Sequence, residues 1–401
     1  MINVIGLGYI GLPTALMLAA HGNEVVGTDI NSDVIDKLNA GEVTFQEDGL
    51  KDLFVMAVNS GITFSADYAR ASMYIVAVPT PYDKSTKKVD PHYVITSVET
   101  ILSVCDSGAI IIIESTVSPG TVEQHIRPLI SGKDVHLVHA PERIIPGNML
   151  HELKNNSRII GADDVAVSNS VREMYATFCI GDIVVTDIKT AEMTKVVENT
   201  FRDINIAFAN ELAKICRSGG MDVYEIIRMA NMHPRVNIMQ PGPGVGGHCI
   251  SVDPWFLVGD YPGLANIILA ARKINDSMPE YVLERICDVM NEHGITDASR
   301  VGLYGLTYKE NVDDVRESPT LQLLDAQRKH LAQGLKVYDP YIKSSVVGNQ
   351  FYNLGEFLDS IDVVVIMVGH DEIKREAHRL TGKVVVDTRG VCGIKDGAYT
   401  L

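Results

Sequence analysis

The sequence predicts an α/β protein with two doubly wound domains joined by a helical middle region that contains a long central helix. Three observations predict this fold class. Short apolar runs alternate with amphipathic stretches at both ends of the chain, and apolar residues recur at helical intervals in the middle. The 401 residues also exceed the length at which a single hydrophobic core stops growing. We therefore expect three domains, over residues 1–188, 189–294 and 295–401.

The first domain is predicted from short runs that are rich in Val and Ile and bounded by Gly, Pro or Asp. Runs of this kind are typical of strands buried in a parallel sheet. They cover residues 2–6, 24–28, 73–78, 109–114 and 135–139.

The middle region begins near residue 189, where apolar residues adopt helical spacing. This predicts a long helix and then a shorter one, with the break at Gly219-Gly220. A Pro/Gly-rich stretch over residues 234–262 interrupts the pattern, and helical periodicity resumes over residues 265–293. The last domain is predicted from four strand-like runs separated by helical segments, at residues 301–306, 335–339, 362–368 and 383–387.

The composition restricts the partners and the compartment. Lys and Arg number 35 against 51 Asp and Glu, so the formal net charge is −16, and no basic cluster interrupts it. This disfavours nucleic acid and anionic membranes as partners. The apolar runs are far shorter than the ~20 residues of a membrane span, and the amino terminus enters a strand pattern directly. Six cysteines occur singly without metal-ligand spacing, so we expect a cytoplasmic protein with mostly reduced, buried thiols and no metal.

A glycine-rich turn follows the first predicted strand. Gly6, Gly8 and Gly11 form a GxGxxG pattern that runs into a predicted helix, as in Rossmann-like domains. The first glycine permits the tight turn, the second permits a pyrophosphate to approach the backbone, and the third permits close packing of helix on strand. Asp29 ends the next strand, where its carboxylate can accept a hydrogen bond from a ribose 2′-hydroxyl. No Arg follows it in residues 30–32, so NAD is favoured over NADP; the alternative is a turn that binds no nucleotide.

A second candidate site lies in the Pro/Gly-rich stretch, around Cys249. Four glycines precede this thiol within eight residues, and Asp253 follows it. Glycine-dense backbone permits close approach of a substrate, and a thiol near a helix amino terminus has a lowered pKa. Cys249 is therefore a candidate nucleophile, and the alternative is a structural thiol. His248 is expected to have a structural or supporting role.

Two further polar groups could serve a site. Lys195 and Asn199 are four residues apart, so they project from one face of the long helix. A buried lysine and a neighbouring amide could stabilise an oxyanion, but a solvated helix face is the alternative. Lys309 and Arg316 follow the first strand of the last domain, where they could hold phosphates or pair with neighbouring acids.

Taken together, these segments resemble the UDP-glucose/GDP-mannose dehydrogenase family along nearly the whole chain. The matching segments are residues 6–13, 78–81, 114–116, 141–143, 244–250 and 316–319, with Lys195, Asn199, Asp253 and Lys309. The resemblance implies oxidation of the C6 hydroxymethyl group of a nucleotide sugar to a carboxylate. It also implies two NAD molecules used in succession, a cysteine that holds the carbon between the steps, and a homodimer or higher homo-oligomer built on the long helix.

The resemblance implies a role for each matched residue. Cys249 would be the nucleophile, Lys195 and Asn199 its polar partners, and Asp253 the base that activates water, while Thr116 and Glu142 complete the catalytic pocket. The implied cofactor contacts are Gly6, Gly8, Tyr9, Ile10, Gly11, Asp29, Pro79, Thr80, Thr116 and Arg316. The implied substrate contacts are Glu142, Arg143, Lys195, Asn199, Arg202, Arg235, Gly246 and Lys309, with Arg235 reaching the substrate site of a neighbouring subunit.

Departures from the UDP-glucose branch narrow the substrate. Arg143 and Pro146 stand in a loop where UDP-glucose enzymes commonly carry Phe-Leu and a second Glu, and Val252 replaces a Lys. With His248, these features resemble the dehydrogenases of UDP-N-acetylhexosamines. Within that branch, the resemblance favours UDP-N-acetyl-D-mannosamine as the substrate, and the segments that carry it are residues 200–211, 231–238 and 252–256. The alternative substrate is UDP-N-acetylglucosamine, and UDP-glucose is less favoured.

Two other functions are possible for a chain with these segments. A two-electron β-hydroxyacid dehydrogenase would share the first domain but would need neither a nucleophilic thiol nor a second α/β domain. A catalytically silent nucleotide-sugar-binding protein would not need Cys249 together with Lys195, Asn199 and Asp253. These four residues therefore favour the enzyme.

Overall fold

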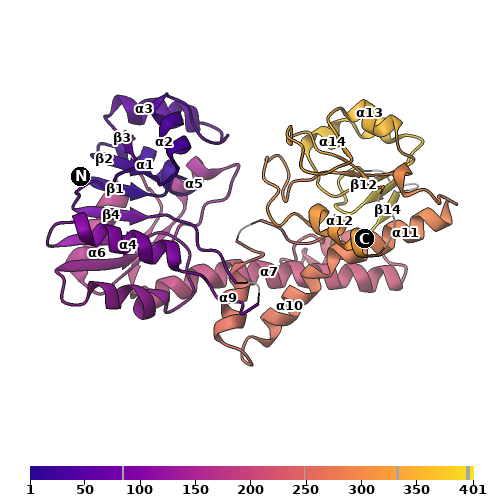
Figure 1. Ribbon diagram of the computed structural model, residues 1–401. Coiled ribbons are helices and arrows are strands. Elements are labelled where there is room, and N and C mark those ends of the chain that lie inside the picture. The colour runs from indigo at the N-terminus through magenta and orange to yellow at the C-terminus, as the bar shows by residue number, and fades with distance from the viewer. Residues whose placement is uncertain (84, 248, 331–333, 394–397) are drawn as a thin grey trace. The chain divides into compact units, whose positions relative to one another are not determined.

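The structure of the protein is a computed structural model, and it describes residues 1–83, 85–247, 249–330, 334–393 and 398–401 (Figure 1). The chain forms two compact units, Met1–Glu198 and Asn199–Leu401. Their boundary falls inside one long helix, α7 (Ile188–Ser218). The α/β class, the two doubly wound sheets and the long central helix predicted from the sequence are confirmed. The division into three domains stays a prediction.

The first unit contains an eight-stranded sheet in the order β3-β2-β1-β4-β5-β6-β7-β8. Its neighbours are parallel except for the antiparallel pair β6 and β7. The strands are β1 (Ile2–Ile5), β2 (Val25–Thr28), β3 (Thr63–Ser65), β4 (Met73–Val76), β5 (Ala109–Ile113), β6 (Val135–His139), β7 (Arg158–Ala162) and β8 (Ile183–Thr186). All five predicted strands are present, whereas β3, β7 and β8 were not predicted.

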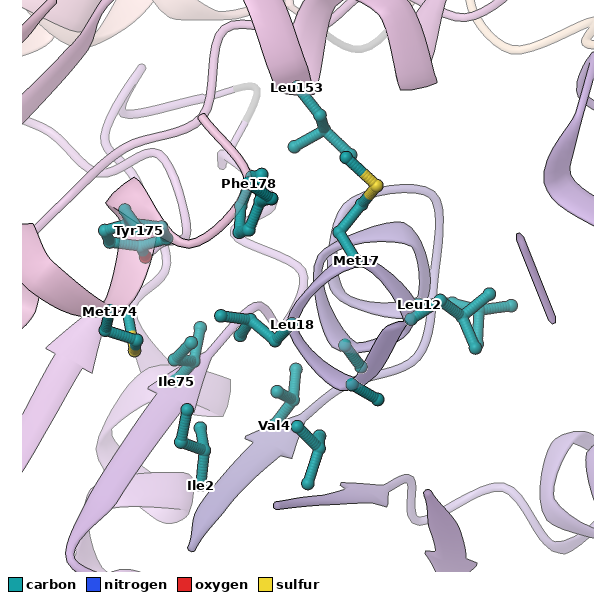
Figure 2. Packing of buried hydrophobic residues seen from close by; sticks show 14 of the residues in the cluster. Ile2, Val4, Leu12, Met17, Leu18, Ile75, Leu153, Met174, Tyr175 and Phe178 are labelled. Atoms are coloured by element: carbon teal, nitrogen blue, oxygen red, sulfur yellow. The ribbon is translucent and has the colours of Figure 1, made fainter. Parts of the chain in front are cut away.

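Helices cover both faces of this sheet. They are α1 (Gly11–Ala20), α2 (Ser32–Asn39), α3 (Leu50–Asn59), α4 (His92–Val104), α5 (Met149–Asn155) and α6 (Val165–Ala176), with short turns at Val122–Ile126 and Arg127–Ile130. Alternate residues of β5 enter different cores: Ile112 packs in the cluster with α1 and α6, and Ile111 in the cluster with α4. Figure 2 shows Leu18 of α1 pointing toward Ile75 of β4, and Met17 toward Leu153 of α5.

The second unit begins within α7, which ends just before the predicted break at Gly219-Gly220. The shorter predicted helix is α8 (Val223–Ala230), whose N-cap Asp222 accepts hydrogen bonds from two backbone N–H groups. The region predicted to be irregular contains a helix, α9 (Asp253–Asp260). The helical stretch that follows is two helices, α10 (Asn266–Asp276) and α11 (Met278–Glu292), which meet at Ser277.

The last part of the second unit is a parallel six-stranded sheet in the order β11-β10-β9-β12-β13-β14. The strands are β9 (Val301–Tyr304), β10 (Lys336–Tyr338), β11 (Gln350–Phe351), β12 (Val363–Ile366), β13 (Val384–Asp387) and β14 (Ala398–Thr400). Its helices are α12 (Pro319–His330), α13 (Leu354–Asp359) and α14 (Asp371–Arg375), with short turns at Ala298–Arg300 and Ala377–Leu380. The four predicted strands are confirmed, and the two edge strands β11 and β14 were not predicted. Within the described part of the chain, no helix has the length and apolarity needed to cross a bilayer.

Candidate active site

The glycine-rich turn joins β1 to α1 with the geometry that the sequence predicts. Gly6 has φ +86°, and a Cβ there would lie 2.6 Å from the Ala77 carbonyl oxygen. A Cβ on Gly11 would lie 1.8 Å from the Gly6 carbonyl oxygen, so this glycine is required by helix packing. A Cβ on Gly8, in contrast, would meet no atom within 4 Å. The chain itself leaves space above Gly8 at the amino terminus of α1, which fits the pyrophosphate of a dinucleotide.

Asp29 lies at the carboxyl end of β2, beside this turn. Its Oδ2 accepts a hydrogen bond from the backbone N–H of Leu7 at 2.8 Å, and its Oδ1 accepts one from Asn31 at 2.9 Å. The carboxylate is half-buried and keeps acceptor capacity for a ribose hydroxyl. Tyr9 lies in the turn and contacts Phe45 at 4.4 Å between ring centroids, and Ile10 is the N-cap of α1. These residues fit NAD.

The segments after β4 and β5 carry the predicted Thr80 and Thr116. The Thr80 hydroxyl donates a hydrogen bond to the carbonyl oxygen of Thr116 at 2.7 Å. Pro79 is exposed beside them. Because β1, β4 and β5 are parallel neighbours, their carboxyl ends lie at the same edge of the sheet as the glycine-rich turn.

A buried carboxylate on α7 holds the loop that follows Thr116. Glu192 accepts hydrogen bonds from the backbone N–H groups of Gly120, at 2.5 Å, and Val122, at 2.9 Å. Burial raises the pKa of Glu192 to about 7, although these two N–H groups oppose the rise. The sequence placed Glu192 one turn before Lys195 but gave no signal for this contact.

Glu142 belongs to a buried cluster of charges. Its carboxylate forms an ion pair with Arg158, whose other terminal nitrogen donates to Glu114 at 3.2 Å. The Tyr175 hydroxyl donates to the same Glu114 oxygen, and the Arg158 guanidinium lies 4.0 Å from the centroid of the Tyr175 ring. One guanidinium therefore serves two carboxylates. Burial raises the pKa of Glu114 to about 7, against the attraction of Arg158 and with the repulsion of Glu142.

Arg143, which the resemblance places at the substrate, pairs with an acid of its own unit. Its Nη1 donates to Glu198 at 2.6 Å, and its Nη2 donates to the carbonyl oxygen of Ser157. A substrate contact at Arg143 would therefore compete with Glu198.

Lys195 and Asn199 lie one turn apart on α7, and both side chains are buried. The sequence pattern left open whether this face was solvated, and the structure excludes that alternative. The Asn199 amide donates a hydrogen bond to the Asp253 Oδ2 at 2.6 Å, and Asp253 is 3% exposed. This contact joins two of the predicted catalytic residues across 54 positions of the sequence.

Cys249 is the exposed member of the six cysteines, all of which fall within the described residues and none of which forms a disulfide. It lies in the turn that leads into α9, four residues before Asp253, and its carbonyl oxygen accepts the backbone N–H of Asp253 at 2.8 Å. A helix amino terminus favours the thiolate form. His248 lies outside the described residues.

The glycines before Cys249 permit close backbone packing. The N–H of Gly247 donates to the carbonyl oxygen of Arg316 at 2.9 Å. A Cβ on Gly246 would lie 2.5 Å from the carbonyl oxygen of Glu317 and 2.8 Å from Cβ of Tyr308. Gly246, a predicted substrate contact, is thus also required by the approach of two loops within the second unit.

A buried polar network supports the thiol loop. Arg272 of α10 pairs with Asp203 of α7 at 2.6 Å, and both are almost wholly buried. Asn275 donates to Asp203 at 2.8 Å and accepts from Asn210 at 2.8 Å, and Asn210 accepts the N–H of Gly242 at 2.9 Å. The network therefore links α7 and α10 to the start of the glycine-rich segment. None of these contacts was predicted.

The remaining predicted residues occupy varied surroundings. Arg202 is half-buried on α7, and Arg235 is exposed after α8. Lys309 is half-buried in the loop after β9. Arg316 forms an ion pair with Asp314, with its Nε at 2.8 Å from Oδ1. The pairing with a neighbouring acid that the sequence allowed is therefore present at Arg316.

The predicted catalytic residues divide between the two units. Thr116, Glu142 and Lys195 belong to the first, and Asn199, Cys249 and Asp253 to the second. No cluster of three or more His, Cys, Asp or Glu side chains suited to a metal ion occurs among the described residues. The chemistry that these groups offer is dinucleotide binding in the first unit and thiol nucleophilic chemistry in the second.

Comparison with known proteins agrees with these two chemistries. Models of the UDP-glucose/GDP-mannose dehydrogenase family match the chain as an NAD binding domain over residues 1–179, a central domain over 189–277 and a UDP binding domain over 302–394. A relative from Methanocaldococcus jannaschii named UDP-N-acetyl-D-mannosamine dehydrogenase is 42% identical in an alignment that covers 97% of this chain and 92% of the relative. A relative from Ralstonia nicotianae named NDP-N-acetyl-D-galactosaminuronic acid dehydrogenase is 40% identical, covering 98% of this chain and 96% of the relative.

A solved structure gives the same result. The UDP-N-acetyl-mannosamine dehydrogenase of Staphylococcus aureus is 38% identical, with a TM-score of 0.89 over 100% of this chain and 97% of the other. The three family models cover most of the sequence, and the relatives align along nearly all of it. The chain therefore belongs to the UDP-glucose/GDP-mannose dehydrogenase family and is an NAD-dependent nucleotide-sugar dehydrogenase.

Proposed function

We propose that the protein oxidises UDP-N-acetyl-D-mannosamine at C6 to UDP-N-acetyl-D-mannosaminuronate, a four-electron reaction that consumes two NAD. The observation that carries the chemistry is the exposed Cys249 in the turn that leads into α9. The first residue of that helix, Asp253, is hydrogen-bonded to Asn199. The name of the 42% identical relative supports the choice of sugar. The four-electron outcome distinguishes this reaction from that of a β-hydroxyacid dehydrogenase.

In this proposal the first unit holds the cofactor. Gly6, Gly8 and Gly11 leave room for the pyrophosphate, Tyr9 and Ile10 form the turn, and Asp29 accepts from the ribose. Pro79, Thr80 and Thr116 line the cofactor site, and the resemblance adds Arg316 as a cofactor contact. Bound NAD supplies the hydride acceptor for each oxidation.

The second unit supplies the nucleophile. After the hydroxymethyl group has been oxidised to an aldehyde, the Cys249 thiolate adds to its carbon and forms a thiohemiacetal. Lys195 and Asn199 donate hydrogen bonds to the resulting oxyanion. Oxidation of this adduct gives a thioester. Asp253 takes a proton from the water that attacks the thioester carbon, and the carbon–sulfur bond breaks to release the carboxylate and the thiol.

The proposed substrate site also includes six residues that the resemblance implies as substrate contacts: Glu142, Arg143, Arg202, Arg235, Gly246 and Lys309. The buried Glu142–Arg158 pair fixes the position of Glu142, whereas Lys309 supplies a positive charge suited to a diphosphate. Arg235 is exposed and extends toward the substrate of a neighbouring subunit in this proposal.

The experiment that tests this function is an NAD reduction assay with a panel of nucleotide sugars. We expect the highest kcat/KM with UDP-N-acetyl-D-mannosamine, and two NADH formed for each sugar consumed. One NADH per sugar would contradict the thioester route. Binding of the sugar without any NADH would favour the catalytically silent protein instead.

A second candidate substrate is a gluco- or galacto-configured 2-acetamido sugar. The relative named NDP-N-acetyl-D-galactosaminuronic acid dehydrogenase favours it, because it is 40% identical over nearly the whole chain. A pocket that pairs the acetamido N–H and C=O leaves buried groups unsatisfied with UDP-glucose, at a cost of about 1–3 kcal/mol for each group. UDP-glucose should therefore be poor, and a lead for UDP-N-acetylglucosamine in the same panel would move the assignment to the sister activity.

We also propose that α7 pairs with a second copy of the chain in a homodimer or higher homo-oligomer. Phe201, Phe208 and Ile215 are 64%, 49% and 54% exposed, and their spacing of seven residues places them along one stripe. Replacing both phenylalanines by Glu should give a monomer in light scattering, while Val55→Glu, at an exposed residue of α3, should not. A cytoplasmic location remains a prediction from the sequence.

A further inference from the structure

A buried histidine lies beside the loop that carries Lys309. His370 has no exposed surface and directly precedes α14. Its Nδ1 lies 2.9 Å from the backbone nitrogen of Asn311, which can only donate, so Nδ1 must be unprotonated and accept. The ring proton of the neutral imidazole is then on Nε2, which faces Asp339 Oδ2 at 3.1 Å and Thr307 Oγ1 at 3.3 Å. The contacts therefore fix one tautomer.

The orientation of this ring is also fixed by packing. Tyr341 lies 5.0 Å and Tyr304 5.9 Å from the imidazole, measured between ring centroids. Asp339 is held in turn, because its Oδ2 accepts the N–H groups of Leu306 and Thr307 at 2.6 and 3.1 Å. His370 thus connects the carboxyl end of β10 to the loop after β9.

The loop that carries Lys309 has an unusual backbone conformation, which contacts with neighbouring residues stabilise. Asn311 has φ +59°, in the left-handed region that residues other than glycine rarely adopt. Its side-chain oxygen accepts the N–H of Asp371 at 3.1 Å and the hydroxyl of Tyr341 at 3.2 Å. The Thr307 hydroxyl donates to the carbonyl oxygen of Lys309 at 2.8 Å. The backbone on both sides of Lys309 is therefore attached, directly or through Thr307, to His370.

We propose that His370 is a positioning residue for Lys309, and that the Nδ1 contact with Asn311 holds this loop in the conformation that binds a nucleoside diphosphate. The inference rests on the proposed function, in which Lys309 contacts the sugar nucleotide. A loop held in advance binds without the entropic cost of ordering, so loss of the contact lowers affinity even though His370 does not touch the ligand. The cofactor turn is in the other unit, so we expect NAD affinity to depend far less on His370 than UDP affinity does.

Two substitutions separate the two ring nitrogens. In His370→Asn, the side-chain oxygen can occupy the place of Nδ1 and accept from Asn311, while the donor to Asp339 is lost. In His370→Gln, the amide nitrogen can reach the place of Nε2 and donate to Asp339, while the acceptor for Asn311 is lost. UDP is the probe, and its affinity is measured by calorimetry on the full chain, with NAD affinity measured on the same samples.

The two variants should differ in UDP affinity. We expect His370→Gln to weaken UDP about ten-fold, as for loss of one buried hydrogen bond, and His370→Asn to retain affinity within about three-fold. NAD affinity should change little in either variant, and thermal unfolding of the same samples should show that the mutated second unit folds. His293→Gln, at an exposed histidine of the same unit, is the matched control and should bind UDP as the parent does. Equal losses in the Asn and Gln variants, or no loss in either, would overturn the proposal.

A double-mutant cycle tests whether His370 acts through Lys309. Lys309→Ala should weaken UDP, and adding His370→Gln to it should cause little further loss, because the loop then has no charge to position. Independent, additive losses would show a general structural role and overturn the proposal. Normal UDP affinity in Lys309→Ala would instead overturn the assignment of Lys309 in the proposed function. Because UDP lacks the hexosamine, a wrong choice of hexosamine in the proposed function leaves this test unaffected.

Discussion

The first strand of each sheet is followed by the same kind of glycine turn, but the two turns have different surroundings. In the first unit β1 leads into Gly6 with φ +86°, and Asp29 at the end of the neighbouring strand accepts the N–H of Leu7. In the second unit β9 leads into Gly305 with φ +99°, and Asp339 at the end of β10 accepts the N–H of Leu306. Each strand thus ends in a Gly-Leu turn fixed by a carboxylate.

The difference lies in what surrounds each carboxylate. Asp29 is half-buried and open to a ligand, whereas Asp339 is 1% exposed and binds His370. The positions that correspond to Gly8 and Gly11 in the first turn are Thr307 and Glu310 in the second. The turn therefore belongs to the fold. The choice of ligand is made by the residues beyond it, so the shared turn does not predict a second dinucleotide site.

The largest effect on activity should come from replacing the Cys249 thiol, which belongs to neither sheet. Cys249→Ser should lower overall turnover at least ~10³-fold, because a hydroxyl is a far weaker nucleophile near neutral pH. NAD and UDP affinities should stay near those of the parent, which separates ligand binding from chemistry. Steady-state kinetics and calorimetry measure both, with Cys105→Ser as the control. Formation of the acid by the Ser variant at the parent rate would rule out the covalent route.

Substitutions of the turn glycines should separate an effect on stability from an effect on cofactor binding. Gly305→Ala should destabilise the protein by about 2–4 kcal/mol, because φ is +99° and the new Cβ would lie 2.5 Å from the Val368 Cβ. Gly8→Ala meets no atom within 4 Å, so it should leave stability unchanged and raise the KM for NAD. Thermal unfolding and kinetics check the pair. Equal destabilisation by both would contradict the distinction.

The two carboxylates provide the next test. Asp29→Ala should reduce the preference for NAD over NADP by about ten-fold, because a charge that repels a 2′-phosphate is removed. Asp339→Asn should lower stability and leave the cofactor preference unaltered. The ratio of kcat/KM for the two cofactors measures this preference. If Asp29→Ala did not alter that ratio, Asp29 would not be the discriminating residue.

The smallest expected effect is on how the free energy of unfolding changes with pH. The direction of this change differs between a carboxylate of the first unit and one of the second. Glu114 in the first unit has a folded pKa of about 7, above its ordinary 4.5, so its contribution to stability falls as pH rises from 4.5 to 7. Asp339 in the second unit has a lowered pKa, opposed by burial and caused chiefly by His370, so its contribution is lost as pH falls.

The substitution Glu114→Gln checks this sign. It should remove part of the loss of stability between pH 5 and 7, on the order of 1 kcal/mol, since Glu192 retains a contribution of the same sign. Denaturant unfolding at the two pH values measures it. A steeper loss in the variant than in the parent would contradict the raised pKa.

The sequence predicted the central strands better than the others. Strands such as β4 and β12 are runs of apolar residues because both faces of a central strand are covered. In contrast, β7 begins with Arg158, and the edge strand β8 exposes Val184 and Val185. The arginine at the start of β7 interrupts the apolar pattern that identifies a buried strand. The run over residues 183–185 of β8 is apolar, and this strand could have been predicted from the sequence.

The sequence predicted which residues belong to the candidate site, but it did not predict which residues they contact. Cys249 stood out because of its glycines, and Asn199 because of its helical spacing to Lys195. The bond from Asn199 to Asp253 and the ion pair of Glu142 with Arg158 join residues with no common local pattern. Supporting contacts of this kind depend on tertiary structure, and a single sequence carries no signal for them.

The spacing of three anchors on α7 limits how this gene can change in length. Asn199, Asp203 and Asn210 each bond to a different partner in the second unit, and all three project from one side of the helix. One inserted codon between Asp203 and Asn210 would rotate the following residues by ~100° and advance them by ~1.5 Å, so the later anchor would miss its partner. A seven-codon insertion would nearly restore the rotation but displace that anchor by ~10 Å. Evolution and protein engineering can therefore exchange residues in this segment, whereas insertions and deletions must fall in the surface loops.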